Sequence, residues 1–196
     1  MHSDRRLRVA RIERHAGSVA PILALGGILL ATILDPTFSW VHDALSDLGV
    51  RDASASVFNG SLVLGGLLAV IYGVGIARRT ESIVQRLIGV LFSLAALHLA
   101  GVGLFVIGHP LHVPAAIGFY GLMTVIFLID GYERREEPTG KLCFGLAAVH
   151  VAIWGTWFAT WWPGTGLALP EFAGALLVPV WIWFVGTEPT LRSSTT

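Results

Sequence analysis

The side chains best suited to chemistry gather in residues 35–56, of which 37–56 read TFSWVHDALSDLGVRDASAS. Asp43 and Asp47 are four residues apart, and so are His42 and Ser46. Residues at that spacing share a face of a helix, so these carboxylates, imidazole and hydroxyl would meet on one short helix. Such a set could activate a water or a serine, or bind a cation or a polar head group. It could equally be the solvated face of an amphipathic helix.

The helix that would hold these residues has a signature of its own. Thr37 or Ser39 could cap its start, and Gly49 stands where it should stop. We expect the helix to lie flat on a membrane with its apolar side down. Apolar residues recur at three- and four-residue steps and form that side: Trp40, Val41, Leu45 and Leu48.

The composition excludes an ordinary soluble domain and a disordered chain. Hydrophobic residues make up 54% of the 196, charged residues only 13%, and the mean hydropathy is +0.71. A soluble domain has about 25% charged residues. The sequence therefore predicts an all-α integral membrane protein. The single cysteine, Cys143, rules out an intrachain disulfide and a cysteine-rich metal centre.

Six apolar segments are long enough, or nearly so, to cross about 30 Å of hydrocarbon. We expect one transmembrane domain over 1–196, a six-helix bundle with the short amphipathic helix in its first outer loop. Small-residue pairs such as Gly73/Ala77 and Gly89/Ser93 predict close helix packing. The six segments are 17–34, 57–77, 87–107, 114–129, 142–162 and 167–186.

The positive charges predict the orientation. Of the 13 Lys and Arg residues, 12 fall on one side of the six segments, and only Arg51 falls on the other. Both ends, the basic stretch 1–16 and the tail 187–196, are therefore expected in the cytoplasm, in a multi-pass protein of the cell membrane. Membrane lipids are the expected partners, because anionic lipids are attracted by about 1 kcal/mol per positive charge. No motif indicates a nucleotide or nucleic acid; cofactor, metal content and oligomeric state stay open.

A family resemblance covers nearly the whole chain and rests on four runs. They are 38–40 (Phe-Ser-Trp), 44–49 (Ala-Leu-Ser-Asp-Leu-Gly), 58–60 (Phe-Asn-Gly) and 65–66 (Gly-Gly). These runs resemble an uncharacterised prokaryotic membrane family, domain of unknown function 998. The resemblance implies that Ser46, Asp47, Gly49 and Asn59 carry the family's signature. The family is distantly similar to six-span Frag/DRAM/Sfk-type proteins, some of which are linked to lipid remodelling.

Polar residues inside the apolar segments are further candidates, because they are costly there. His98 and His150 lie near the middle of the bilayer, where each could bond to a neighbouring helix, or both could form a proton relay or a metal pair. His109 and His112 could ligate one metal if their loop formed a turn. Few comparable groups fall in the inner half of the bundle. The outer half holds Asp35, His42, Asp43, Ser46, Asp47, Asn59, His109, His112, Tyr120 and Glu171.

Aromatic residues of the fifth segment form a stripe with His150. Trp154, Trp157 and Trp161 follow it at helical spacing, and Trp162 stands beside them. The stripe is either an interfacial aromatic belt or one wall of an outward-opening pocket.

Three functions remain in competition. The first is a protein without chemistry that binds a lipid or amphiphile in an outward-facing pocket, through Asp43, Asn59, Tyr120, Trp154, Trp157 and Glu171. The second is a lipid-modifying hydrolase or transferase at the outer leaflet. In it Asp47 or His42 is the base that activates a water or Ser46, and Glu171 or a histidine is the acid. A bound metal would assist by lowering the pKa of the water. The third is a small transporter or proton pathway through His98 and His150.

Overall fold

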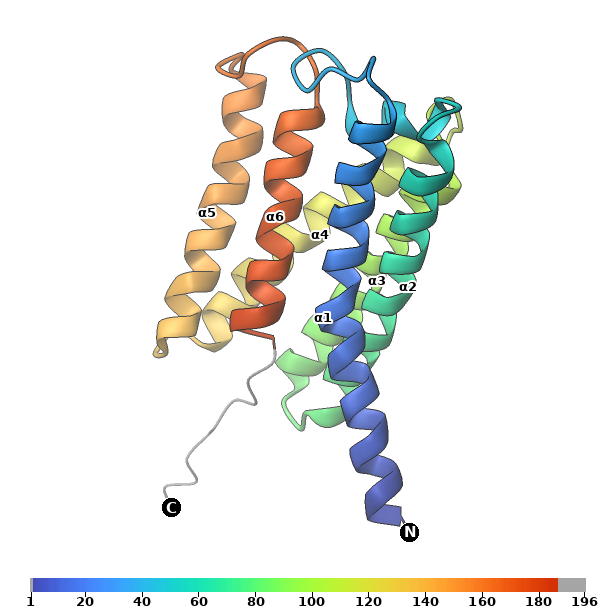
Figure 1. The fold of residues 1–196 in the computed structure, drawn as a ribbon. Coiled ribbons are helices and arrows are strands. Elements are labelled where there is room, and N and C mark those ends of the chain that lie inside the picture. The colour runs from blue at the N-terminus through green and yellow to red at the C-terminus, as the bar shows by residue number, and fades with distance from the viewer. Residues whose placement is uncertain (1, 187–196) are drawn as a thin grey trace.

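Each predicted apolar segment largely coincides with one α-helix of the computed structural model, which describes residues 2–186 (Figure 1). A six-residue 3₁₀ helix, η1 (Leu45–Val50), lies in the first outer loop. The all-α prediction is confirmed, since the described part contains no strand; the tail 187–196 lies outside the described residues. The helices are α1 (His2–Leu34), α2 (Ala55–Arg79), α3 (Ile83–Leu104), α4 (His112–Glu133), α5 (Pro138–Phe158) and α6 (Ala168–Phe184).

The fifth helix ends four residues before its predicted end at 162, and the reason is local. Thr160 adopts a left-handed backbone conformation, φ 58°. Its N–H donates to the carbonyl of Trp157 (2.9 Å), and the N–H of Trp161 donates to the carbonyl of Thr156 (3.0 Å). These two bonds form a Schellman motif, which closes a helix. Glycine usually takes the left-handed position, so a threonine there gives little warning in the sequence.

The helices run up and down, and consecutive ones pack side by side, from α1 to α5. α6 then returns to contact α5, α4 and α1. Both ends of the described chain lie at the same end of the bundle (Figure 1). We call that the inner end, and the opposite end, with the loops 35–54, 105–111 and 159–167, the outer end.

Small residues bring α2 and α3 together, as the sequence predicts. A Cβ on Gly66 would lie 2.7 Å from the carbonyl oxygen of Ala96, and one on Gly89 would lie 2.7 Å from the carbonyl oxygen of Gly73. Real Cβ atoms do not approach that closely. Glycine at these positions therefore allows the backbone contact that substitutes for hydrophobic attraction inside a membrane.

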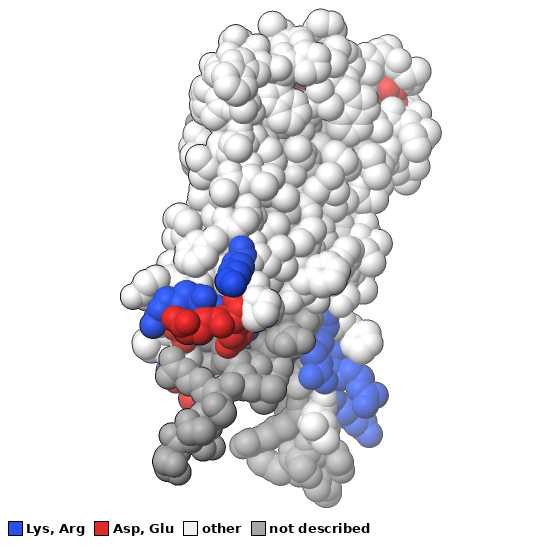
Figure 2. Space-filling model, turned by 90° about the vertical axis from the view of Figure 1, so that its left-hand side faces the viewer, with Lys and Arg blue, Asp and Glu red and all other residues white. Residues whose placement is uncertain are grey.

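The length and composition of the helices fit a multi-pass membrane protein. Within residues 2–186, five helices are long and apolar enough to span a bilayer, and α6 is a shorter apolar helix of 17 residues. At 1.5 Å per residue it extends about 26 Å. On the face drawn in Figure 2, charged side chains gather toward the inner end, and the broad band above them is uncharged.

Candidate functional site: outer cap, buried polar groups and apolar recess

The first outer loop does not form the predicted amphipathic helix over Thr37 to Gly49. Its first part consists of turns, and only η1 is helical. The cause lies in two aspartates that bond to the backbone before them. The N–H of Ser39 donates to Oδ2 of Asp43 (2.8 Å), and the N–H of Ala44 donates to Oδ2 of Asp47 (2.8 Å). Such local bonds compete with a continuous helix. The expectation that Asp43 and Asp47 share one helical face is therefore wrong.

The apolar residues of this loop face the protein. Leu45 and Leu48 are buried, with 4% and 0% exposure, in a core cluster at the outer end of the bundle. The ring of Trp40 packs edge-on against Phe38 (5.5 Å between centroids) and Phe172 of α6 (5.3 Å). The expectation of a helix lying flat on the membrane is wrong, because these side chains close the end of the bundle.

Arg51 ties the loop to the end of α1. Its Nη2 donates to Oδ2 of Asp43 (2.8 Å), and its Nη1 lies 3.4 Å from Oδ2 of Asp35. The Thr37 hydroxyl, together with its N–H and Arg51, holds the pKa of Asp35 below the ordinary 3.8. Burial alone would raise the pKa of Asp43, but the N–H of Ser39 and the Arg51 guanidinium outweigh it and lower that pKa. Both carboxylates are therefore held as anions that fix the loop.

The loop between α5 and α6 docks on the first loop. The N–H of Gly166 donates to the carbonyl of Val41 (3.0 Å), and the N–H groups of Leu167 and Ala168 donate to the carbonyl of Asp43 (3.1 and 2.9 Å). Gly164 has φ +74°, and a Cβ there would overlap the carbonyl of Val41. Glycine is required at that position both for its conformation and for the close approach. We call the two interlocked segments, 35–51 and 159–168, the outer cap.

Glu171 fastens α6 to the outer cap. Its Oε2 accepts a hydrogen bond from the N–H of Leu45 (2.8 Å), and its carbonyl accepts one from the hydroxyl of Tyr120 on α4 (2.9 Å). The structure thus brings two predicted ligand-binding residues together. Their contacts link the cap, α4 and α6.

The predicted catalytic residues do not meet. His42 is exposed, whereas Ser46 is buried, and the carboxylate of Asp47 accepts from Ala44. No hydrogen bond joins these three side chains in the described structure, so a base–nucleophile pair is not assembled. Asn59 instead supports η1, because its Nδ2 donates to the carbonyl of Gly49 (2.8 Å), while its Oδ1 is buried without a partner. Across residues 2–186, no three His, Cys, Asp or Glu side chains form a potential metal site.

His150 forms the interhelical bond that was one of its predicted roles. The indole Nε1–H of Trp154 donates to its Nε2 (3.3 Å). Its proton is therefore on Nδ1, which donates to Oγ1 of Thr124 on α4 (2.8 Å). Since both ring nitrogens are engaged, a metal could bind only by displacing one of these partners.

His98 does not pair with His150. The His98 ring occupies the space that a Cβ on Gly118 of α4 would need, whereas the His150 ring lies 6.1 Å from that of Phe127. Gly118 and Phe127 are nine residues apart, or about 180° around α4 at 3.6 residues per turn. The two histidines therefore contact opposite sides of α4, and the alternative of a metal pair or direct relay is not formed.

The remaining aromatic and histidine predictions are only partly met. Trp157 donates from Nε1 to the carbonyl of Gly166 (3.0 Å), which links α5 to the outer cap. Trp161 and Trp162 lie beyond the end of α5, so the prediction of a continuous stripe is wrong.

The histidine pair His109 and His112 lies where α3 connects to α4. Nδ1 of His109 accepts from the N–H of Leu111 (3.1 Å), and Nδ1 of His112 bonds to the carbonyl of Phe105 (2.6 Å). Both rings are thus engaged with their own loop.

The inner half holds a buried polar cluster that the sequence analysis missed. Asp130 is fully buried. Its Oδ1 accepts hydrogen bonds from Nε2 of Gln85 and from Nε of Arg134, and its Oδ2 accepts one from Nε1 of Trp181. Each of the three bonds is 2.9 Å long. The buried thiol of Cys143 lies 3.8 Å from Oδ2. The expectation of few polar groups in this half is therefore wrong. The one signal in the sequence is the i,i+4 spacing of Asp130 and Arg134, which is typical of a helical ion pair.

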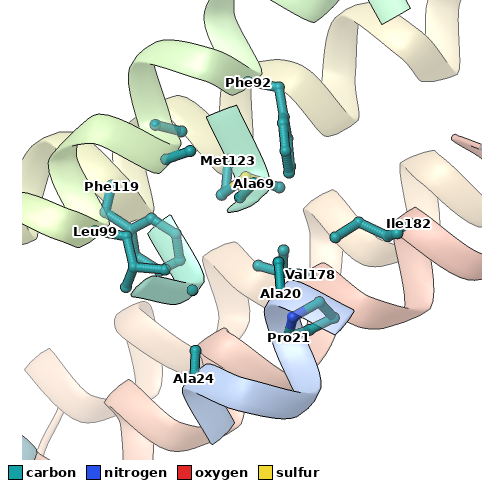
Figure 3. A pocket seen from close by; sticks show the side chains of 13 residues that line it. Ala20, Pro21, Ala24, Ala69, Phe92, Leu99, Phe119, Met123, Val178 and Ile182 are labelled. Atoms are coloured by element: carbon teal, nitrogen blue, oxygen red, sulfur yellow. The ribbon is translucent and has the colours of Figure 1, made fainter. Parts of the chain in front are cut away.

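An apolar recess lies between these two polar regions, at the middle of the bundle. Its volume is about 30 Å³, and no polar side chain lines it. Figure 3 shows the labelled side chains around the empty space. Ala24 in its wall is ten residues from the outer end of α1, or about 15 Å along the helix. The lining residues are Ala20, Pro21, Ala24, Gly65, Ala69, Phe92, Ala95, Ala96, Leu99, Phe119, Met123, Val178 and Ile182.

Comparison with known proteins identifies a family and no activity. No curated protein and no solved structure matches this chain. The similarity to Frag/DRAM/Sfk-type proteins is therefore not confirmed and stays a prediction. Residues 18–188 match a family described as "Protein of unknown function (DUF998)". That match includes all of α2 to α6 and about half of α1, so the chain belongs to this family of multi-pass membrane proteins of unknown function.

Proposed function

We propose that this protein binds the hydrocarbon chain of a lipid or other amphiphile in the apolar recess. The single observation that carries the proposal is an empty space, lined only by apolar side chains, at mid-depth in a bundle whose helices have the length and composition of membrane spans. Apolar cavities stay free of water, so only an apolar group would fill this one favourably. The nearest abundant apolar groups are lipid chains.

The size of the recess favours a narrow linear chain. A cavity of about 150 Å³ is known to bind benzene, and the recess has about 30 Å³. A ring therefore does not fit without rearrangement, whereas the thin end of an alkyl chain requires little. The ligand class that we propose is therefore an amphiphile with a linear chain.

The position of the recess changes one part of the sequence-based hypothesis. The proposed pocket was to open outward, with the polar groups of the first loop at its mouth. The outer cap instead covers that end with Leu45 and Leu48. We therefore place the bound chain laterally, among the helices. The polar groups of the cap act in this proposal as structural contacts.

Photoactivatable lipids test the proposal. The protein is reconstituted in vesicles with a phospholipid that carries a diazirine at the end of one chain, and cross-linked residues are mapped by mass spectrometry. We expect cross-links at the recess in the wild type. Ala24→Leu fills the recess from α1 and should reduce them at least about fivefold, since overpacking costs 1–3 kcal/mol.

The matched control is Ala148→Leu, which makes the same change at an exposed position of α5. It should leave cross-linking at the recess unchanged. Circular dichroism checks that both variants are folded. Equal cross-linking in the two variants, or cross-links only on exposed helix faces, would overturn the proposal.

A further inference from the structure

We infer that the chain enters the recess between α1 and α6, and that α6 is the wall that moves. This inference rests on the proposed function, because it concerns access to the same recess. Three features of α6 support it: sparse contacts with α1 and α4, polar contacts near its two ends, and a proline between them.

α6 is the least firmly packed wall of the recess. The walls formed by α1, α2, α3 and α4 make extensive contacts with one another in chain order, whereas α6 has few contacts with α1 and fewer with α4. α5 packs on both α4 and α6, and so covers the seam between them. Among the described residues, no other α-helix packs on both α1 and α6 in this way; η1 contacts both at the outer end, and the two helices lie next to each other in Figure 1. The seam between α1 and α6 is therefore the side on which a lipid chain meets the fewest obstacles.

Polar contacts hold α6 near its two ends. At the outer end, Glu171 accepts from the N–H of Leu45, and the first N–H groups of the helix bond to the outer cap. Toward the inner end, Trp181 donates to Asp130. These bonds are 2.8–3.1 Å long and hold the helix at two places about ten residues apart. Hydrogen bonds between helices are one of the attractions available in hydrocarbon, beside close van der Waals packing.

The middle of α6 is held by apolar packing, since Leu177, Val178 and Val180 lie against the main core cluster. Val178 lines the recess between the two sets of polar contacts, and Ile182 lines it just beyond Trp181. Pro179 lies between them and cannot donate the backbone bond that would reach the carbonyl of Ala175. Proline and small residues are the usual places where a helix bends. Bending of α6 away from Ala20 and Pro21 of α1 would open the recess without breaking the contacts among α1 to α4.

Distance measurements between spin labels test whether α6 moves. Labels on exposed positions Ile22 of α1 and Leu176 of α6 report the seam, and a second pair, Ile22 and Leu64 of α2, reports the fixed part. Cys143 is replaced by alanine in every variant. We expect Glu171→Ala to shift the α1–α6 distances to longer values and to broaden them, with the α1–α2 distances unchanged. Unchanged α1–α6 distances, or equal changes in both pairs, would overturn the inference.

Control and rescue variants distinguish the loss of the bonds that hold α6 from a general loss of folded structure. Glu81→Ala removes an exposed carboxylate and should change neither distance. Glu171→Gln keeps an oxygen that can accept from Leu45 and should resemble the wild type. Trp181→Phe releases the inner bond but keeps a ring against Phe92, and should again lengthen only the α1–α6 distances.

The rate of lipid cross-linking then distinguishes the entrance from the recess. If the seam is the entrance, Glu171→Ala should speed the approach to the final extent of cross-linking about fivefold, as expected for a lost bond of about 1 kcal/mol. If Glu171→Ala leaves the cross-linking rate and its final extent unchanged, the seam between α1 and α6 is not the entrance, and the proposed function still stands. Absence of cross-linking in the wild type refutes the proposed function, and the label distances still decide whether α6 moves.

Discussion

The buried carboxylate of Asp130 offers the sharpest test of how the inner half is stabilised. Replacement by asparagine keeps the size of the side chain but removes its charge and turns one oxygen into an NH₂ group. In either orientation, that NH₂ group faces a donor, either Trp181 or the pair Gln85 and Arg134. At least one hydrogen bond is lost, and the buried guanidinium of Arg134 loses its nearest anion, at 2.9 Å.

The expected cost follows from the burial of the ion pair. Asp130 and Arg134 are 1% and 3% exposed at their side chains. Breaking a buried pair by changing one partner costs about 3–5 kcal/mol. In a domain of 150–250 residues, each kcal/mol lowers Tm by about 2–4 °C, so Asp130→Asn should lower it by about 6–20 °C.

The assay is thermal unfolding in detergent, followed by circular dichroism at 222 nm. Asp52→Asn makes the same change at an exposed outer position and should shift Tm by less than about 2 °C. The double variant Asp130→Asn/Arg134→Gln should recover part of the loss, because no net charge is then left in the cluster. A shift below about 2 °C for Asp130→Asn, or a double variant as unstable as the sum of the single ones, would refute the reasoning.

Three further predictions concern the outer half. Gly164→Ala should make the outer cap sensitive to limited proteolysis, because the left-handed backbone and the close approach at this position exclude a Cβ. The control Gly155→Ala has open space around it and should not increase proteolysis. The protection of the cap amides, measured relative to their intrinsic exchange rates, should stay high above pH 3.8 and fall as pH drops through the lowered pKa of Asp43, since that stabilisation requires the anion. Arg51→Gln should move this loss of protection to higher pH. His150→Phe should shift the fluorescence of its indole donor and lower stability by about 1–2 kcal/mol in thermal unfolding, because it removes two hydrogen bonds.

The sequence was sufficient for the bundle because apolar length is a strong and local signal. Each of the six helices is read from its own composition, and the even number of helices puts both ends of the chain on one side. The small-residue contacts between α2 and α3 also followed from spacing alone. The end of α5 was missed because a threonine, Thr160, takes the left-handed position that glycine usually marks.

The amphipathic helix in the outer loop was predicted wrongly for a different reason. Its three- and four-residue apolar spacing is real, but Asp43 and Asp47 bond to the backbone before them and divide the segment into turns. The same apolar residues can close the end of a bundle or lie on a membrane, and the pattern does not distinguish these outcomes. The inner cluster joins residues from distant helices, such as Gln85 and Trp181 around Asp130, so only the packed fold could bring it to view.

The separation of polar and apolar contacts along α6 has a consequence for both proposals. The bonds of Glu171 and Trp181 lie toward the ends of the helix, and Val178 and Ile182 line the recess, which has no polar side chain in its wall. Changes at the ends should therefore alter how fast a chain enters, and a change in the wall, such as Ala24→Leu, should alter how tightly it binds. Trp181 touches the recess wall, because its ring stacks on Phe92 (5.2 Å between centroids). Glu171 and Ala24 have no hydrogen bond or ring contact between them in the described structure, so the free-energy effects of changing these two should add within about 0.5 kcal/mol. Strong coupling between Glu171→Ala and Ala24→Leu would instead mean that the cap and the recess form one site, and that the bound chain helps to hold α6 in place.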